Sequence, residues 1–167
     1  MKFGFALGSN VGDRRACLIE ARSRLEQLAP DSSELLCASL YESAPLDCPP
    51  GSAPFLNTCL ELELELDPEA LHTLTRELER FLGRPEVRAQ NAPRTIDIDI
   101  LYAGDLTLRG PELILPHPRL HQRRFVLEPL CEIRPALVLP GLERSVSALL
   151  NELETREAAP ILVARDW

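Results

Sequence analysis

The stretch Thr95-Ile96-Asp97-Ile98-Asp99-Ile100-Leu101-Tyr102 decides the fold. Isoleucine occupies every second position from 96 to 100, and the two aspartates alternate with it. A period of two is typical of a β-strand that buries one face and exposes the other. The sequence therefore predicts a strand over residues 95–102, with the isoleucines inward and with Asp97 and Asp99 together on the opposite face.

Three more strands are predicted upstream. Residues 2–7 and 35–43 are short apolar runs, each bounded by turn-forming residues. From Phe55 onward, every second residue between 60 and 66 is leucine, which predicts a further strand with leucines toward the core. The residues expected to face water on that strand are Cys59, Glu61, Glu63 and Glu65.

Two helices are predicted between these strands. Asp13 and Asp67-Pro68 stand where helices begin, because a carboxylate caps the first N–H groups and proline fits the first helical position. Apolar residues then recur at helical spacing over residues 14–29 and from residue 68 to Gly83. The buried line of the second helix is expected to be Leu71, Leu74, Leu78 and Phe81.

The predicted order is β-α-β-β-α-β, which is the ferredoxin-like arrangement of the α+β class. Helices near residues 122–132 and 146–154 and a short edge strand at 161–165 are expected to follow. Because 167 residues suit one ordinary domain, we expect residues 1–167 to form a single domain with additional C-terminal helices.

Composition narrows the class of protein. With 45% hydrophobic and 26% charged residues, the chain is typical of a soluble globular protein rather than a disordered one. No apolar run approaches a membrane span, and the N-terminus lacks a signal-peptide core. The five cysteines form no C-x-x-C pair, and their odd number argues against a secreted disulfide framework. We therefore expect a cytoplasmic protein.

Charge is distributed unevenly along the chain. The net charge of −8 argues against nucleic acid or an anionic membrane as a partner. Residues 84–124, however, hold seven arginines against five acidic residues. Clustered arginine and histidine can bind a polyphosphate, although surface cations would give the same pattern. The cations near the aspartate strand in sequence are Arg84, Arg88, Arg94, His117, Arg119, His121, Arg123 and Arg124.

Asp97 and Asp99 are candidates for a metal site. Two positions apart on a strand, their Cα atoms lie roughly 6.6 Å apart on one face, so the carboxylates can converge on the same ions. Mg²⁺ is commonly held by one or two carboxylates together with substrate phosphates. The alternative is a solvated polar face, as predicted for Glu61, Glu63 and Glu65.

Phe55, Asn57 and Phe125 are candidates for binding a flat heteroaromatic ring. Two aromatic side chains can sandwich such a ring while an amide pairs with its polar edge. Core packing is the alternative for both phenylalanines. Because Lys2 is the only lysine, neither a P-loop nor a protein-kinase site is available for a nucleotide.

Residues 91–101, Asn-Ala-Pro-Arg-Thr-Ile-Asp-Ile-Asp-Ile-Leu, resemble the signature of the 6-hydroxymethyl-7,8-dihydropterin pyrophosphokinase family of folate biosynthesis. Residues 6–10, 41–46, 55–57 and 115–130 are similar to further segments of that family, in the same order. The resemblance implies transfer of diphosphate from ATP to the pterin hydroxymethyl group, with release of AMP and with two Mg²⁺ ions. We expect no nucleic-acid or membrane partner, and we expect a monomer.

The resemblance also assigns roles by position. It implies Asp97 and Asp99 as magnesium ligands, and Arg84 and Arg94 as further catalytic residues. The implied pterin site consists of Ser43, Leu46, Phe55, Asn57 and Phe125. The implied ATP contacts are Glu79, Arg88, Arg94, Ile100, His117 and Arg123.

Two departures from the family pattern lie between residues 84 and 94. Gln90 and Asn91 stand where many members have a basic residue and tryptophan. Glu86 stands where a second arginine is expected, and Arg88 is the candidate to replace it.

Two other functions fit the same predicted fold. An RNA-recognition domain shares the element order but needs exposed aromatics and a basic sheet surface, where this chain has Glu61, Glu63 and Glu65. A non-catalytic module that binds pterin or nucleotide for regulation is the closer alternative. The intact pair Asp97 and Asp99 favours the enzyme.

Overall fold

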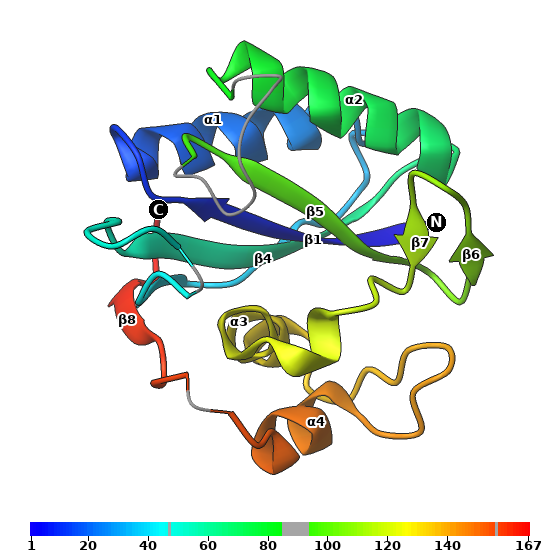
Figure 1. Cartoon of the computed structure of the whole chain (residues 1–167). Helices are drawn as coiled ribbons and strands as arrows, with labels where there is room; N and C mark the ends of the chain where they lie inside the picture. The colour runs from blue at the N-terminus through cyan, green and yellow to red at the C-terminus, as the bar shows by residue number, and fades with distance from the viewer. Residues whose placement is uncertain (47, 85–93, 156) are drawn as a thin grey trace.

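A computed structural model describes residues 1–46, 48–84, 94–155 and 157–167, and within them six strands form one antiparallel sheet (Figure 1). Its order is β5-β1-β4-β3-β8, with β2 also paired to β4. The strands are β1 (Lys2–Ser9), β2 (Leu36–Cys37), β3 (Leu40–Ser43), β4 (Phe55–Glu63), β5 (Asp97–Ala103) and β8 (Ile161–Ala164). This order confirms the predicted ferredoxin-like core, and the predicted strand over 35–43 divides into β2 and β3.

Strand β1 lies between β5 and β4 and aligns these two strands. Gly8 is paired with Asn57 of β4 on one side and with Asp97 of β5 on the other. On β3, Ser43 is paired with Phe55 of β4. The register therefore places the candidate ring-binding residues beside the candidate metal ligands.

Helices α1 (Arg14–Glu26) and α2 (Pro68–Phe81) cover one face of the sheet (Figure 1). The predicted caps are confirmed, since Asp13 accepts from Ala16 N–H at 3.0 Å and Asp67 accepts from Glu69 N–H at 2.9 Å. Helix α1 ends three residues before the predicted end. The predicted burial of Leu74 and Phe81 is wrong: they are 36% and 67% exposed, and the Arg24 guanidinium lies over the Phe81 ring.

Helices α3 (Arg124–Ile133) and α4 (Val146–Glu152) lie on the opposite side of the sheet, with α3 against β4 (Figure 1). The prediction that Cys59 and Glu61 face water is wrong. Because α3 covers this face of β4, they are 0% and 4% exposed. Glu61 accepts from the Tyr102 hydroxyl at 2.6 Å and from Arg134 Nε at 2.8 Å. Its charge is thus neutralised in the layer between β4 and α3.

The connection from β5 to α3 holds elements that the sequence pattern did not predict. Strands β6 (Leu108–Arg109) and β7 (Ile114–Leu115) pair with each other, and a 3-10 turn covers Leu120–Gln122. No helix among the described residues has the length and hydrophobicity of a membrane span.

Candidate active site

Asp97 and Asp99 lie where two cavities meet. One cavity of about 310 Å³ opens on the side of β3, β4 and α3, and another of about 240 Å³ opens toward α2 and the β6–β7 hairpin. These two aspartates are the only described residues that line both. Their side chains are 23% and 36% exposed, so the carboxylates can be reached from either cavity.

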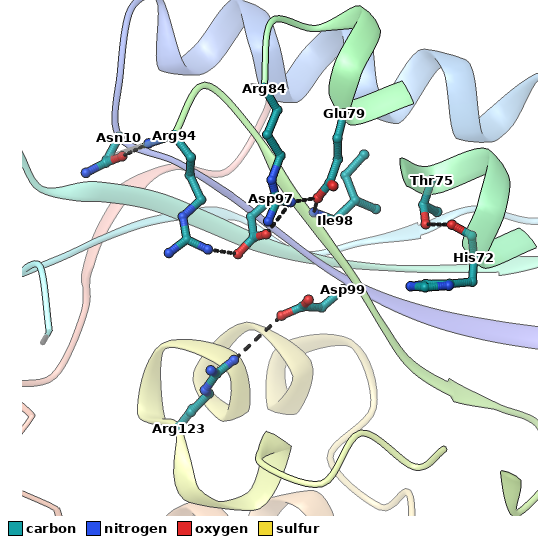
Figure 2. A network of polar contacts seen from close by, with 10 residues as sticks. All are labelled: Asn10, His72, Thr75, Glu79, Arg84, Arg94, Asp97, Ile98, Asp99 and Arg123. Carbon is teal, nitrogen blue, oxygen red and sulfur yellow. Dashed lines mark hydrogen bonds and ion pairs between the residues drawn. The ribbon is translucent and has the colours of Figure 1, made fainter. Parts of the chain in front are cut away.

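Three arginines from separate segments surround the aspartates (Figure 2). Arg84 Nη1 lies 2.6 Å from Asp97 Oδ1, and Arg94 pairs with the other oxygen of the same carboxylate. Arg123 Nη1 lies 3.6 Å from Asp99 Oδ2. Desolvation, with the adjacent charge of Asp97 second, raises the pKa of Asp99 to about 6 despite these arginines. The site thus holds two close carboxylates under a layer of cations.

Glu79 connects α2 to the aspartate strand. It is 2% exposed, accepts from Ile98 N–H at 2.8 Å, and pairs with Arg84 (Figure 2). Its carboxylate therefore fixes the β5 backbone between the two aspartates and holds the Arg84 guanidinium beside Asp97. Glu79 also lines the second cavity.

The first cavity gathers the five residues expected for the pterin: Ser43, Leu46, Phe55, Asn57 and Phe125. Asn57 Nδ2 donates to Ser43 Oγ at 2.8 Å, which leaves the Asn57 amide oxygen to accept from a ligand. Arg94 lies 5.7 Å from the centroid of the Phe55 ring, and Arg123 lies 5.5 Å from that of Phe125. The cavity is therefore lined by aromatic rings, by one amide that can hydrogen-bond to the polar edge of a ligand, and by cations beside the aspartates.

The second cavity gathers Glu79, Arg84, Ile100 and His117. Burial, reinforced by Arg123 and Arg119, lowers the pKa of His117 to about 4, so its ring is neutral at physiological pH. Because its Nδ1 accepts from Arg119 N–H at 3.2 Å, the ring proton is assigned to Nε2, which can donate to an anion.

Two of the predicted ATP contacts, Arg94 and Arg123, line the first cavity rather than the second. Arg119 lines the first cavity, whereas Arg124 pairs with Glu128 on α3 at 3.2 Å and His121 lies against Gln122. The predicted role of Arg88, and the departures at Glu86, Gln90 and Asn91, lie outside the described residues.

The sequence assigns no role in the site to Asn10, which ends the segment 6–10 that resembles the family. It is 3% exposed, and its Oδ1 accepts from Arg94 N–H at 2.8 Å (Figure 2). Its own N–H donates to the Arg94 carbonyl at 3.1 Å, and its Nδ2 donates to the Ala53 carbonyl at 3.2 Å. Asn10 thereby joins the segments that lead to Asp97 and to Phe55. Its partners are backbone groups, which leave no mark in the sequence.

The donor set at the junction suits a hard cation. Among the described residues no group of three or more His, Cys, Asp and Glu side chains could hold a metal ion, which leaves the carboxylates of Asp97 and Asp99. Mg²⁺ is held by one or two carboxylates and completes its shell with phosphate oxygens and water, whereas structural Zn²⁺ needs four nitrogen or sulfur ligands. The residues present fit Mg²⁺ bound together with a phosphorylated substrate.

Comparison with known proteins agrees with this geometry. Residues 4–135 match the family model for 7,8-dihydro-6-hydroxymethylpterin-pyrophosphokinase. A 2-amino-4-hydroxy-6-hydroxymethyldihydropteridine pyrophosphokinase of Bacillus subtilis is 43% identical over 129 residues, which cover 77% of this chain and 75% of that protein. A protein of the same name from Porphyromonas gingivalis is 40% identical over 136 residues, covering 79% and 90%.

A solved structure shares the fold at low identity. The wild-type HPPK-DHPS of Plasmodium falciparum, determined with pteroate, superposes with a TM-score of 0.68 at 15% identity. The match covers 90% of this chain but only 42% of that longer one. The family model spans most of the chain, and the relatives exceed 30% identity over most of it. The chain therefore belongs to the 7,8-dihydro-6-hydroxymethylpterin-pyrophosphokinase family.

Proposed function

We propose that this protein transfers the terminal diphosphate of ATP to the hydroxymethyl oxygen of 6-hydroxymethyl-7,8-dihydropterin and releases AMP. One observation carries the proposal: two cavities of different chemistry meet at a single pair of carboxylates. A transfer between two bound substrates requires both reacting groups to be held at one point. The aspartate junction offers that point.

The first cavity suits the pterin. Phe55 and Phe125 offer aromatic faces to a planar bicyclic ring, and the Asn57 amide can pair with its donor and acceptor edge. The second cavity suits the nucleotide. Arg84 and the Nε2–H of His117 offer donors to phosphate oxygens, beside the apolar side chain of Ile100.

The chain's own groups provide positioning and charge neutralisation. Arg84 and Arg94 are paired with Asp97 in the structure, and we propose that their guanidinium groups would pair with the triphosphate oxygens, while Asp97 and Asp99 would hold the metal. When bound, Mg²⁺ supplies charge neutralisation of the phosphate oxygens, and we propose two ions. In an in-line attack, the pterin hydroxyl oxygen would bond to the β-phosphorus while the bond from that phosphorus to the oxygen leaving with AMP breaks, and the hydroxyl proton would pass to solvent. No protein base is needed, because positioning and electrostatics carry most of such transfers.

An assay for AMP release from ATP tests the function. We expect AMP to form only when hydroxymethyldihydropterin and Mg²⁺ are both present, and a chelator should abolish turnover until Mg²⁺ is restored. Binding of both substrates without AMP would contradict the proposal and favour the regulatory module. Unchanged AMP formation in excess chelator would contradict the metal assignment alone.

Replacing Asn57 with leucine should weaken pterin binding by about tenfold or more, because the polar edge of the buried ring would lose its partner at about 1–3 kcal/mol. Ser43→Ala is the matched control: it removes the hydroxyl that holds the Asn57 amide but keeps the amide itself. We expect a smaller loss for this variant. Isothermal titration with the pterin measures both, and unchanged affinity in Asn57→Leu would show that the ring binds elsewhere.

A further inference from the structure

Of the described residues beyond 135, outside the part matched by the family model, Glu157 alone lines the first cavity. Glu157 is half-buried, and its N–H donates to Thr155 Oγ1 at 3.1 Å. A few residues later, β8 pairs with β3, the strand that carries Ser43. Before Glu157, α4 packs against α3, so the chain is held on both sides of Glu157.

Glu157 Oε2 accepts from Arg124 N–H at 3.0 Å, across 33 residues of sequence. Arg124 is the first residue of α3, and the cap position before it, Arg123, provides no side-chain hydrogen bond to the helix. The first N–H groups of a helix have no partner within the helix, and the partial positive charge there favours a carboxylate. Glu157 thus supplies from a distance the cap that α3 lacks locally.

The first turn of α3 is the part of the helix that enters the site. Arg123 lies 3.6 Å from Asp99, and its guanidinium lies 5.5 Å from the centroid of the Phe125 ring. Both side chains line the first cavity, as Glu157 does. An uncapped first turn can unwind, and either residue would then leave its place in the cavity wall.

We propose that Glu157 is a positioning residue, which acts through the first turn of α3 to hold Phe125 ready for the pterin and Arg123 beside Asp99. The inference rests on the proposed function for its kinetic consequence but not for the structural contact. If the intact first turn is populated only part of the time, the apparent affinity for the pterin falls in proportion to that population. The effect should therefore appear first in the KM for the pterin.

Glu157→Ala should raise the pterin KM about fivefold, the equivalent of one lost helix cap, with kcat reduced less than KM is raised. Glu157→Gln keeps an acceptor oxygen and should recover most of that affinity. Glu154→Ala removes an exposed acid from the same segment and is the matched control. A loss of kcat alone, or an equal change in Glu154→Ala, would overturn the proposal, because either would indicate a general loss of folded protein.

Amide hydrogen exchange by NMR tests the contact without any assay. The Arg124 amide should lose protection in Glu157→Ala and regain it in Glu157→Gln, while the amides of β1 remain as in the wild type. Unchanged protection at Arg124 would overturn the proposal even if the enzyme turns over. Conversely, the wild-type protein could lack activity while the protection of its Arg124 amide still depends on Glu157. That result would refute the proposed function but support Glu157 as the cap of α3.

Discussion

Replacing Asp97 with asparagine should lower turnover by about a thousandfold, which corresponds to about 4 kcal/mol of transition-state stabilisation, and Asp99→Asn should do the same. Each change removes a negative charge from the one point where both cavities meet. Neither removes a core contact, and in Asp97→Asn the Arg84 guanidinium keeps its ion pair with Glu79. The melting temperature should therefore stay within about 4 °C of the wild type.

Steady-state AMP release and a thermal melt on the same preparation check this result. Asp105→Asn is the matched control, because Asp105 is exposed in the turn after β5 and loses the same charge away from the cavities. It should turn over like the wild type. Activity within about tenfold of the wild type in either site variant, a barrier change near 1.4 kcal/mol, would refute the metal assignment.

Gly4→Ala should destabilise the protein by about 3 kcal/mol or more, the sum of overpacking and a lost buried hydrogen bond. A Cβ on Gly4 would lie 2.1 Å from Cε1 of the Tyr102 ring on the neighbouring strand. The ring is 2% exposed, and its hydroxyl is held by Glu61 at 2.6 Å, so it cannot move aside and keep that bond. For a chain of this length, a fall in melting temperature of about 10 °C follows.

A double-mutant cycle separates this clash from a general cost of alanine in β1. In a Tyr102→Leu background the ring is gone, so the further change Gly4→Ala should cost less than about 1 kcal/mol. Urea unfolding of the four proteins gives the coupling energy. Equal costs in both backgrounds would show that the Tyr102 ring is not what excludes a side chain at Gly4.

Much of the fold could be predicted because its elements are encoded locally. The alternating isoleucines predicted β5, and the alternating leucines predicted β4. The aspartates at positions 13 and 67 predicted the starts of α1 and α2, the two helices on one face of the sheet. Each signal depends on residues within a few positions of one another, so no knowledge of tertiary contacts was needed.

The burial of Glu61 could not be predicted in this way. Alternation assigns a charged residue to water, but α3 covers that face of β4, and the carboxylate is matched by Tyr102 and Arg134, which lie 41 and 73 residues away. Only the packed structure brings these groups together. Phe81 shows the opposite error. Its helical spacing predicts burial, but the ring faces outward, and the Arg24 guanidinium lies over it.

Some residues of the candidate site could likewise be predicted from the sequence, and others could not. The aspartate pair and the ring-binding set could be proposed from residue types and family resemblance, and the structure brings them into two adjoining cavities. Asn10 and Glu157 could not be proposed, because each acts on backbone N–H groups, of Arg94 and Arg124 respectively. Backbone donors are the same at every residue except proline, so a sequence cannot show which of them needs a partner.

The two cavity walls share Asp97 and Asp99 and, in the described chain, nothing else. On the proposed assignment of the pterin to the first cavity and the nucleotide to the second, selectivity for the ring and selectivity for the nucleotide are therefore separable traits. A substitution around Asn57 can alter one without altering the other, and so can one around His72 or Glu112 at the opposite wall. Adaptation to a new inhibitor or a modified ring can proceed one substrate at a time, whereas the shared pair is the position where variation would affect both at once.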